Sequence, residues 1–175
     1  MEIRIPIQIK TDRLTIRQLV PSDAGFIIEL LNDPSFIQNI GDKNVRTPRD
    51  AKDYIRSAGT DNYARFGFGM LLVGLSESST PVGICGLLQR EFLAYPDIGF
   101  AFLTRFHGLG IGTEAALAIR LWAATTLGIK KLAAFTVLTN RASIHVLEKV
   151  GFTSQGEQDL PGKYGRCHVL EWQSK

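Results

Sequence analysis

The chain has 175 residues, of which 45% are hydrophobic and 21% are charged, a composition that excludes a disordered chain and indicates an ordinary globular protein. No apolar run approaches the roughly 20 residues that a membrane-spanning helix needs. A chain of this length can build one full-sized core but hardly two, so we expect one domain over residues 1–175. The chain has 20 Lys and Arg residues, 17 Asp and Glu residues and a net charge of +3, without a long basic run, so we expect binding to neither nucleic acid nor membrane.

The N-terminal segment, MEIRIPIQIKTDR, alternates apolar and polar residues. A secretory signal would instead show a basic segment followed by an apolar core, so we expect a cytoplasmic protein. Cys85 and Cys167 lie far apart in strand-like runs, without the spacing of metal ligands. This pattern predicts two buried, reduced thiols and no metal site.

One strand and two helices are predicted in the first third of the chain. Residues 13–20, RLTIRQLV, alternate apolar and polar side chains and predict a half-buried strand. The next helix should begin at Ser22 as its N-cap and stop before Pro34. A second helix should begin at Thr47 as its N-cap and end at Gly59.

The rest of the chain alternates strands and helices. The predicted elements are an antiparallel hairpin over about residues 66–92, a buried strand over 97–104 (DIGFAFLT), a helix closed by Gly128, a strand over 130–139, a helix from the N-cap Asn140 to Gly151, and strands at about 152–159 and 164–173. Strand-helix-strand connections require some parallel pairing. We therefore expect an α/β or α+β fold with one mixed sheet.

Three alternating glycines stand before a helix in HGLGIGTEAAL, residues 107–117. A dinucleotide fingerprint would need its third glycine at the position of Thr113, and a P-loop would need a lysine, so both motifs fail. A strand, a glycine turn and a helix start present bare backbone amides at the positive end of a helix dipole, which suits phosphate oxygens. The alternative is a tight turn that lets the helix pack closely against the sheet.

HGLGIGTEA followed by NRASIHVLEKVGF resembles the coenzyme A motif of the GCN5-related N-acetyltransferases, Arg/Gln-x-x-Gly-x-Gly/Ala with a downstream Asn and a closing Gly-Phe. TDRLTIRQL and DIGFAFLTRFHGLGIGTEA are similar to the branch that contains the ribosomal-protein N-terminal (serine/alanine) acetyltransferases. The resemblance covers about residues 11–173. It implies a mixed, strongly twisted sheet of about seven strands flanked by helices. That sheet would be splayed between its fourth and fifth strands, DIGFAFL and KLAAFTVL, where pantetheine enters.

The resemblance also implies an activity, the movement of an acetyl group from acetyl-CoA to a primary amine by direct attack, with strand amides polarising the carbonyl. The expected acceptor is a protein or peptide N-terminal α-amine, in a pocket built from residues 22–59 and 156–168. Two alternatives stay open: a non-catalytic domain that binds acyl-CoA as a sensor, and an acetyltransferase of a small-molecule amine such as an aminoglycoside or polyamine. The expected assembly is a monomer or homodimer.

The family motif, carried over residue by residue, predicts a cofactor site around the glycines. The motif's first position, usually Arg or Gln, is His107, so Arg105 is the alternative source of positive charge. Asn140 matches the family's pantetheine-contacting Asn, although it is also an adequate N-cap. The predicted cofactor-binding residues are Phe102, Arg105, His107, Leu109, Gly110, Ile111, Gly112, Thr113, Asn140 and Ser143.

Asp97 and Ser143 are the catalytic residues that the resemblance implies. Many family members place a Tyr general acid where this chain has Leu147, so Ser143 is the nearest hydroxyl that could protonate the leaving thiolate. Asp97 stands where this branch often has Glu and could deprotonate the amine directly or through water. The alternatives are an exposed Asp97 without a catalytic role and Glu91 as the base. His145 is expected to face away from the site.

Overall fold

The structure is a computed structural model that describes residues 6–174. Residues 1–5 lie outside this description, so only the second part of the alternating N-terminal segment can be compared with its prediction, and residue 175 also lies outside it. The strands are β1 (Gln8–Lys10), β2 (Leu14–Gln18), β3 (Met70–Leu75), β4 (Pro81–Leu88), β5 (Asp97–Phe102), β6 (Lys131–Val137), β7 (Thr153–Leu160) and β8 (Gly165–Gln173). The α-helices are α1 (Ala24–Leu31), α2 (Pro34–Asn39), α3 (Pro48–Ile55), α4 (Asp61–Phe66), α5 (Ile111–Thr125) and α6 (Arg141–Lys149).

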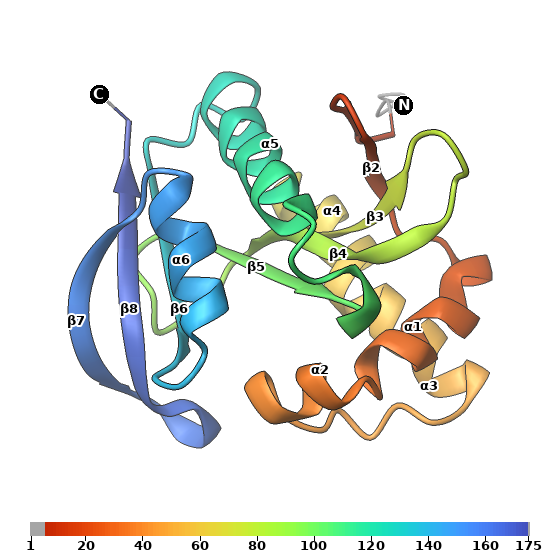
Figure 1. Cartoon of the computed structure of the whole chain (residues 1–175), viewed down its shortest axis with the longest axis horizontal. Coiled ribbons are helices and arrows are strands. Elements are labelled where there is room, and N and C mark those ends of the chain that lie inside the picture. Colours follow the sequence, from red (N-terminus) through yellow and green to blue (C-terminus); the bar gives the residue numbers. More distant parts are fainter. Residues whose placement is uncertain (1–5, 175) are drawn as a thin grey trace.

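All eight strands belong to one mixed sheet with the order β1-β2-β3-β4-β5-β6-β8-β7 (Figure 1). Every neighbouring pair is antiparallel except β5 and β6, which are parallel and share a single registered pair, Asp97 with Ala133. Beyond that pair the two strands separate, so the predicted splay is confirmed. The predicted count of about seven strands differs by the short β1 at one edge of the sheet.

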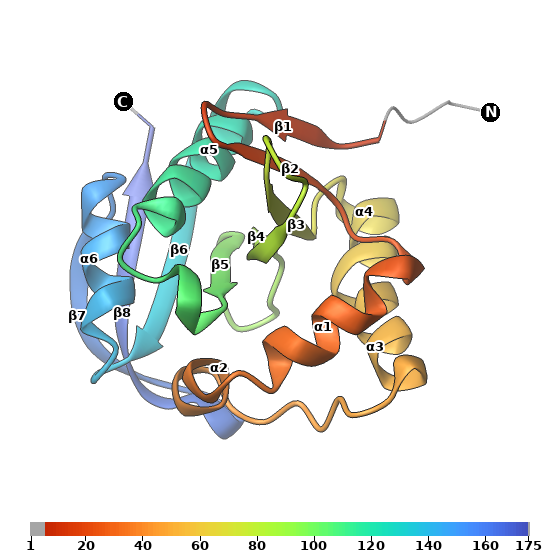
Figure 2. The ribbon, with the colours of Figure 1, turned by 45° about the vertical axis from the view of Figure 1, so that its right-hand side comes forward.

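Helices cover both faces of the sheet (Figure 2). The alternation of side chains along β3 indicates which core each face builds. Leu71 and Val73 pack in a core with buried residues of α5 and α6. Met70 and Leu72 point the other way, into a core with buried residues of α1, α2 and α3. The sheet thus lies between two apolar layers, and the gap between β5 and β6 connects them.

Two predicted helix boundaries are wrong. Ser22 lies in a 3-10 turn, and α1 begins only at Ala24. The first helix does end before Pro34, as predicted, and Pro34 itself begins α2, because proline fits the first helical position and the Asp33 carboxylate accepts a hydrogen bond from the next free amide at 2.9 Å. The chain continues through Gly59 in a π-helical turn into α4, which ends at Gly67.

Two conformational details explain the last of these errors. Gly59 is buried, and a β carbon there would lie 3.0 Å from the Tyr63 hydroxyl, so the glycine is needed for close packing. Gly67 has φ +78°, the left-handed conformation that commonly ends a helix. A glycine in the sequence marks both situations equally, and only the structure separates them.

The cysteine prediction is confirmed, since Cys85 and Cys167 are buried and free. Burial raises the pKa of both thiols. Within residues 6–174, no helix is long and apolar enough to cross a membrane. In that same part of the chain, no three His, Cys, Asp or Glu side chains gather into a group that could hold a metal ion.

Candidate active site

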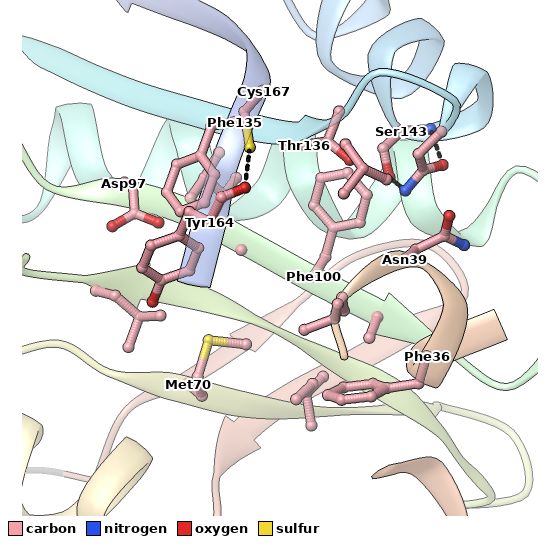
Figure 3. A pocket seen from close by; sticks show the side chains of 18 of the residues that line it. Phe36, Asn39, Met70, Asp97, Phe100, Phe135, Thr136, Ser143, Tyr164 and Cys167 are labelled. Carbon is pink, nitrogen blue, oxygen red and sulfur yellow. Dashed lines mark hydrogen bonds between the residues drawn. The ribbon is translucent and has the colours of Figure 1, made fainter. Parts of the chain in front are cut away.

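A cavity of about 300 Å³ lies where β5 and β6 separate (Figure 3). Its wall includes Phe36 of α2 and Tyr54 of α3 on one face of the sheet, and Ser143 of α6 on the other. Tyr164, in the turn between β7 and β8, closes one end. The segments predicted to build an acceptor pocket, residues 22–59 and 156–168, therefore do line a common cavity.

Asp97 lies at the start of β5, at the point where β5 pairs with β6. Its side chain is buried, and both carboxylate oxygens accept hydrogen bonds from Arg90 Nε, at 3.0 and 3.1 Å. Burial raises the pKa of Asp97 to about 6, although the Arg90 guanidinium favours the charged form. Asp97 is thus a buried cavity residue and not an exposed one, and its carboxylate can accept a proton at neutral pH.

Arg90 connects Asp97 to Tyr164, which lies in the turn between β7 and β8. Its Nη1 donates to the Tyr164 hydroxyl at 2.5 Å, and its guanidinium lies over the rings of Phe135 and Tyr164, 5.1 and 5.3 Å from their centroids. Those two rings meet edge to face at 5.2 Å. Arg90 and Tyr164 were not predicted as site residues, because they are 74 residues apart and both lie outside regular strands and α-helices.

Asn140 and Ser143 begin α6 and face the cavity. The Asn140 side chain accepts from the Ser143 amide at 3.2 Å, so it is an N-cap, and its Nδ2 donates to Ser143 Oγ at 2.9 Å. The Ser143 hydroxyl already accepts one hydrogen bond, which leaves its own proton for another partner. Figure 3 shows Ser143 and Asp97 on opposite sides of the cavity.

The other candidates for acid and base are placed unambiguously. Leu147 is buried and lines the cavity, so the position at which many family members carry a Tyr faces the site but has no hydroxyl. His145 is exposed on α6, as predicted, and does not line the cavity. Glu91 is also exposed and outside the cavity wall, which leaves Asp97 as the carboxylate in reach of a bound amine.

The side of β5 that faces β6 offers backbone groups to a ligand. The Ala133 amide donates to the Pro96 carbonyl at 2.9 Å, and main-chain groups alternate in direction along a strand, so those of Phe100 and Phe102 also point toward β6. Beyond the Asp97 pair, β6 has moved away. The Phe102 carbonyl is instead bonded by His107 Nε2 at 2.8 Å. An extended chain with amide groups, such as pantetheine, fits this open edge.

The predicted phosphate loop joins β5 to α5. Gly108 and Gly110 both have φ +75°, and the Gly110 carbonyl accepts the first helical bond, from the Glu114 amide at 3.0 Å. The amides of residues 111–113 therefore have no acceptors within the helix. They lie at the positive end of a helix of 15 residues, an arrangement that suits the phosphate oxygens of coenzyme A.

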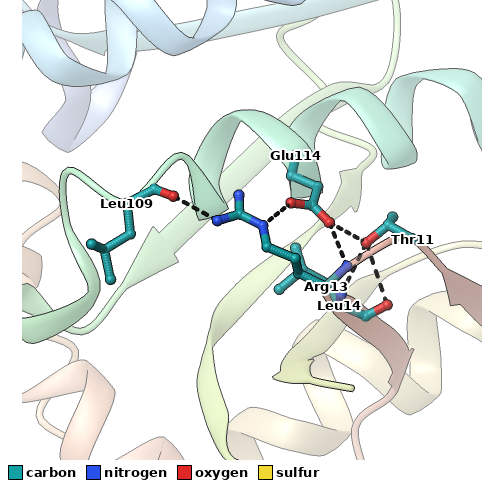
Figure 4. Close-up of polar contacts among 5 residues, drawn as sticks. All are labelled: Thr11, Arg13, Leu14, Leu109 and Glu114. Carbon is teal, nitrogen blue, oxygen red and sulfur yellow. Dashed lines mark hydrogen bonds and ion pairs between the residues drawn. The ribbon is translucent and has the colours of Figure 1, made fainter. Parts of the chain in front are cut away.

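Arg13 and Thr11 hold this loop and the first turn of α5 in place (Figure 4). Arg13 Nη1 donates to the Leu109 carbonyl at 2.9 Å, and Arg13 Nε donates to Glu114 Oε2 at 2.6 Å. The Thr11 hydroxyl donates to the other carboxylate oxygen of Glu114 at 2.6 Å. The negative charge of Glu114, which would repel phosphates at the helix start, is thereby balanced. Both residues stand in the TDRLTIRQL segment quoted above, although their role was not predicted.

Arg105 and His107, the two candidates for the phosphate-side contact, are both engaged with the protein. Arg105 Nη1 donates to Glu29 Oε1 at 2.5 Å, and the His107 ring bonds the Phe102 carbonyl. The Arg105 side chain is 55% exposed, and an exposed ion pair of this kind is exchanged at little cost. A phosphate contact by either residue stays a prediction.

Comparison with known proteins places this geometry in a family. The family model of the GNAT acetyltransferase domain matches residues 13–153. YkkB of Bacillus subtilis (strain 168) is 27% identical over 144 residues, which are 81% of this chain and 82% of that protein.

Two solved structures have the same fold. The acetyltransferase from Agrobacterium tumefaciens str. C58 superposes with a TM-score of 0.82 at 24% identity, covering 99% of this chain and 98% of that one. RimL, a ribosomal L7/L12 α-N-protein acetyltransferase solved with coenzyme A, has a TM-score of 0.82 at 19% identity, covering 95% and 98%. With a family model that spans most of its length, this chain belongs to the GNAT acetyltransferases and is an N-acetyltransferase that uses acetyl-CoA.

Proposed function

We propose that this protein acetylates the N-terminal α-amine of a peptide or protein. The proposal rests on the observation that the cavity contains few side chains that can accept a proton from the amine. Among the described residues that line it, Asp97 is the only carboxylate, and Arg90 already binds both of its oxygens. A site of this kind favours an amine that loses its proton easily.

The pKa of the amine decides which acceptors meet that condition. An α-amine has a pKa of about 7.7 to 8.0, whereas a lysine side chain has a pKa of about 10.4. The neutral fraction of the α-amine near pH 7 is therefore larger by a factor of roughly 300. Deprotonating lysine costs about 3.4 kcal/mol more than deprotonating the α-amine. Among the described residues of the cavity wall, Asp97 is the only carboxylate available to offset that cost.

Each step of the proposed reaction can then be assigned to particular residues. The amides of residues 111–113 hold the pyrophosphate of acetyl-CoA, and Asn140 contacts its pantetheine. Asp97 accepts the proton of the amine, directly or through water, while the new N–C bond forms. The Phe100 amide on the open edge of β5 donates to the acetyl carbonyl oxygen. Ser143 donates a proton to the sulfur as the C–S bond breaks and regains a proton from solvent, while Asp97 releases its proton to solvent. No covalent bond to the protein is formed.

A comparison of matched peptides tests the acceptor. A short peptide with a free N-terminus should outcompete its N-blocked, lysine-containing counterpart at pH 7, measured as thiol release from acetyl-CoA. The rate on the free peptide should rise through the α-amine pKa. Faster reaction of the blocked lysine peptide, of an aminoglycoside or of a polyamine would overturn the α-amine assignment and leave the acetyltransferase activity in place.

Ser143→Ala tests the acid. We expect kcat to fall about tenfold, less than the 100-fold or more typical of general acids, because a thiolate is a good leaving group. The acetyl-CoA Kd should change less than kcat does. The cap of α6 survives the change, because Asn140 bonds the Ser143 backbone amide. An unchanged kcat would remove Ser143 from the mechanism and assign the proton to water.

A further inference from the structure

Two lysine side chains meet at the acceptor end of the cavity. Lys43 follows α2 and is half-buried, whereas Lys163 is exposed in the turn between β7 and β8, and both line the cavity with Arg90 and Asp97. Their segments are far apart in the sequence, and the fold brings their ammonium groups within reach of each other. Burial is the main cause, and together with the nearby charge of Lys163 it lowers the pKa of Lys43 to about 8.

Neither ammonium group has a carboxylate partner within residues 6–174. Every ion pair found in that part of the chain joins an arginine to a carboxylate, and neither lysine belongs to one. Asp97 is committed to Arg90, and Asp42, the neighbour of Lys43 in sequence, is committed to Arg46. The acceptor end of the cavity thus holds three cationic groups and one anionic group.

This balance of charge is unfavourable for an acceptor that is only a cation. An ammonium group entering the cavity would meet Lys43, Lys163 and Arg90 with a single carboxylate to offset them. An acceptor that brings its own carboxylate removes the conflict, because that carboxylate can lie between the two lysines. Asp97 then keeps its pairing with Arg90 and can still accept the proton of the amine.

We propose that Lys43 and Lys163 bind an acidic side chain close to the N-terminus of the acceptor, so that the preferred substrate is a peptide or protein whose first few residues include Asp or Glu. The inference rests on the proposed function above. The phosphates of acetyl-CoA are not the occupants in this proposal, because the glycine loop that suits them does not line this cavity.

The test compares two free N-terminal peptides of equal length, one beginning Ser-Glu-Glu and the other Ser-Gln-Gln, in the same thiol-release assay. We expect kcat/KM to be about tenfold higher for the acidic peptide at low ionic strength, mainly through a lower KM, and the difference to shrink as salt is added. Lys163→Glu should remove this preference. Lys43→Gln, which removes the charge but keeps a polar side chain, should weaken it. The matched control is Lys52→Glu, because Lys52 is exposed on α3 and does not line the cavity.

Each outcome separates the two proposals. Equal rates on both peptides in the wild type would overturn this inference and leave the proposed function standing. An acidic preference that survives both lysine variants would overturn it as well, and so would a large loss of acetyl-CoA affinity in Lys163→Glu, which would assign the lysines to the cofactor. If neither peptide is acetylated while acetyl-CoA still binds, the α-amine function fails and the inference fails with it.

Discussion

Replacing Asp97 by asparagine is expected to lower kcat/KM at pH 7 by about 100-fold, the low end of what a positioned general base contributes. Asparagine keeps the volume of the side chain and one oxygen that can accept from Arg90. The change therefore removes the negative charge and the proton acceptor while preserving the contact that holds the cavity wall. At pH 9 the α-amine is already neutral, so much of the rate should return.

The pH dependence identifies the group responsible. Because burial raises the pKa of Asp97 to about 6, its basic form is present above that pH, and the wild-type rate should rise through about pH 6 and again through the α-amine pKa. Asp97→Asn should lose the first step and keep the second. A variant that retains the step near pH 6, or that responds equally at all pH values, would exclude Asp97 as the base.

A second buried Asp–Arg pair provides the control. Asp23 is buried and accepts from Arg17 at 2.9 Å through each carboxylate oxygen, but it does not line the cavity. Asp23→Asn should leave the pH profile of the rate unchanged. Stability gives an independent readout: since the folded state binds a proton at Asp97 more tightly than the unfolded state, the free energy of unfolding should fall as pH rises from about 4 to 6. That fall should be absent in Asp97→Asn.

Gly112→Val is expected to weaken acetyl-CoA binding at least tenfold, or about 1.4 kcal/mol, in a titration of the folded variant. A β carbon at Gly112 would meet a Phe102 ring carbon at 3.5 Å and a Val146 methyl at 3.8 Å, which are ordinary contacts. Valine is also a better helix former than glycine, so the fold should tolerate the change. Its branches would nevertheless crowd the amides of the first turn of α5, where the phosphates are proposed to bind.

Gly25 offers the matched substitution. It lies in the first turn of α1, and a β carbon there would find no atom within 4 Å. Gly25→Val should leave the acetyl-CoA Kd unchanged. If Gly112→Val is folded and binds acetyl-CoA as tightly as Gly25→Val does, the glycines serve only the packing of α5 against the sheet.

The elements with strong local patterns were predictable from the sequence, and the errors fall where a residue has two structural uses. The alternating run that became β2 and the caps Thr47 and Asn140 were read correctly, because each depends on near neighbours. Pro34 was read only as the limit of the first helix, although proline also starts helices and here begins α2, and Gly59 was misread as a stop, since glycine also permits close packing. Which use applies depends on tertiary contacts that one sequence does not display.

Some residues of the candidate site were likewise predictable from local sequence patterns, and others were not. The glycine loop and Asn140 could be proposed as site residues because each belongs to a short local pattern, a glycine turn before a helix and an N-cap. Arg90 and Lys163 could not, because Arg90 meets Tyr164, and Lys163 meets Lys43, only in the folded chain. A charged residue in a loop does not by itself indicate a functional site, because its role depends on the residues that it contacts in the folded chain.

The single bridge between β5 and β6 also affects the mechanics of the molecule. It divides the sheet into one half of five strands and another of three, and so short a ladder resists bending weakly. A pantetheine chain along the open edge of β5 would supply hydrogen bonds that β6 does not. It would thereby stiffen the connection between the two halves of the sheet. A ligand at 100 times its Kd stabilises a folded state by about 2.7 kcal/mol through mass action. The supply of acetyl-CoA would then govern the rigidity and lifetime of this enzyme as well as its turnover.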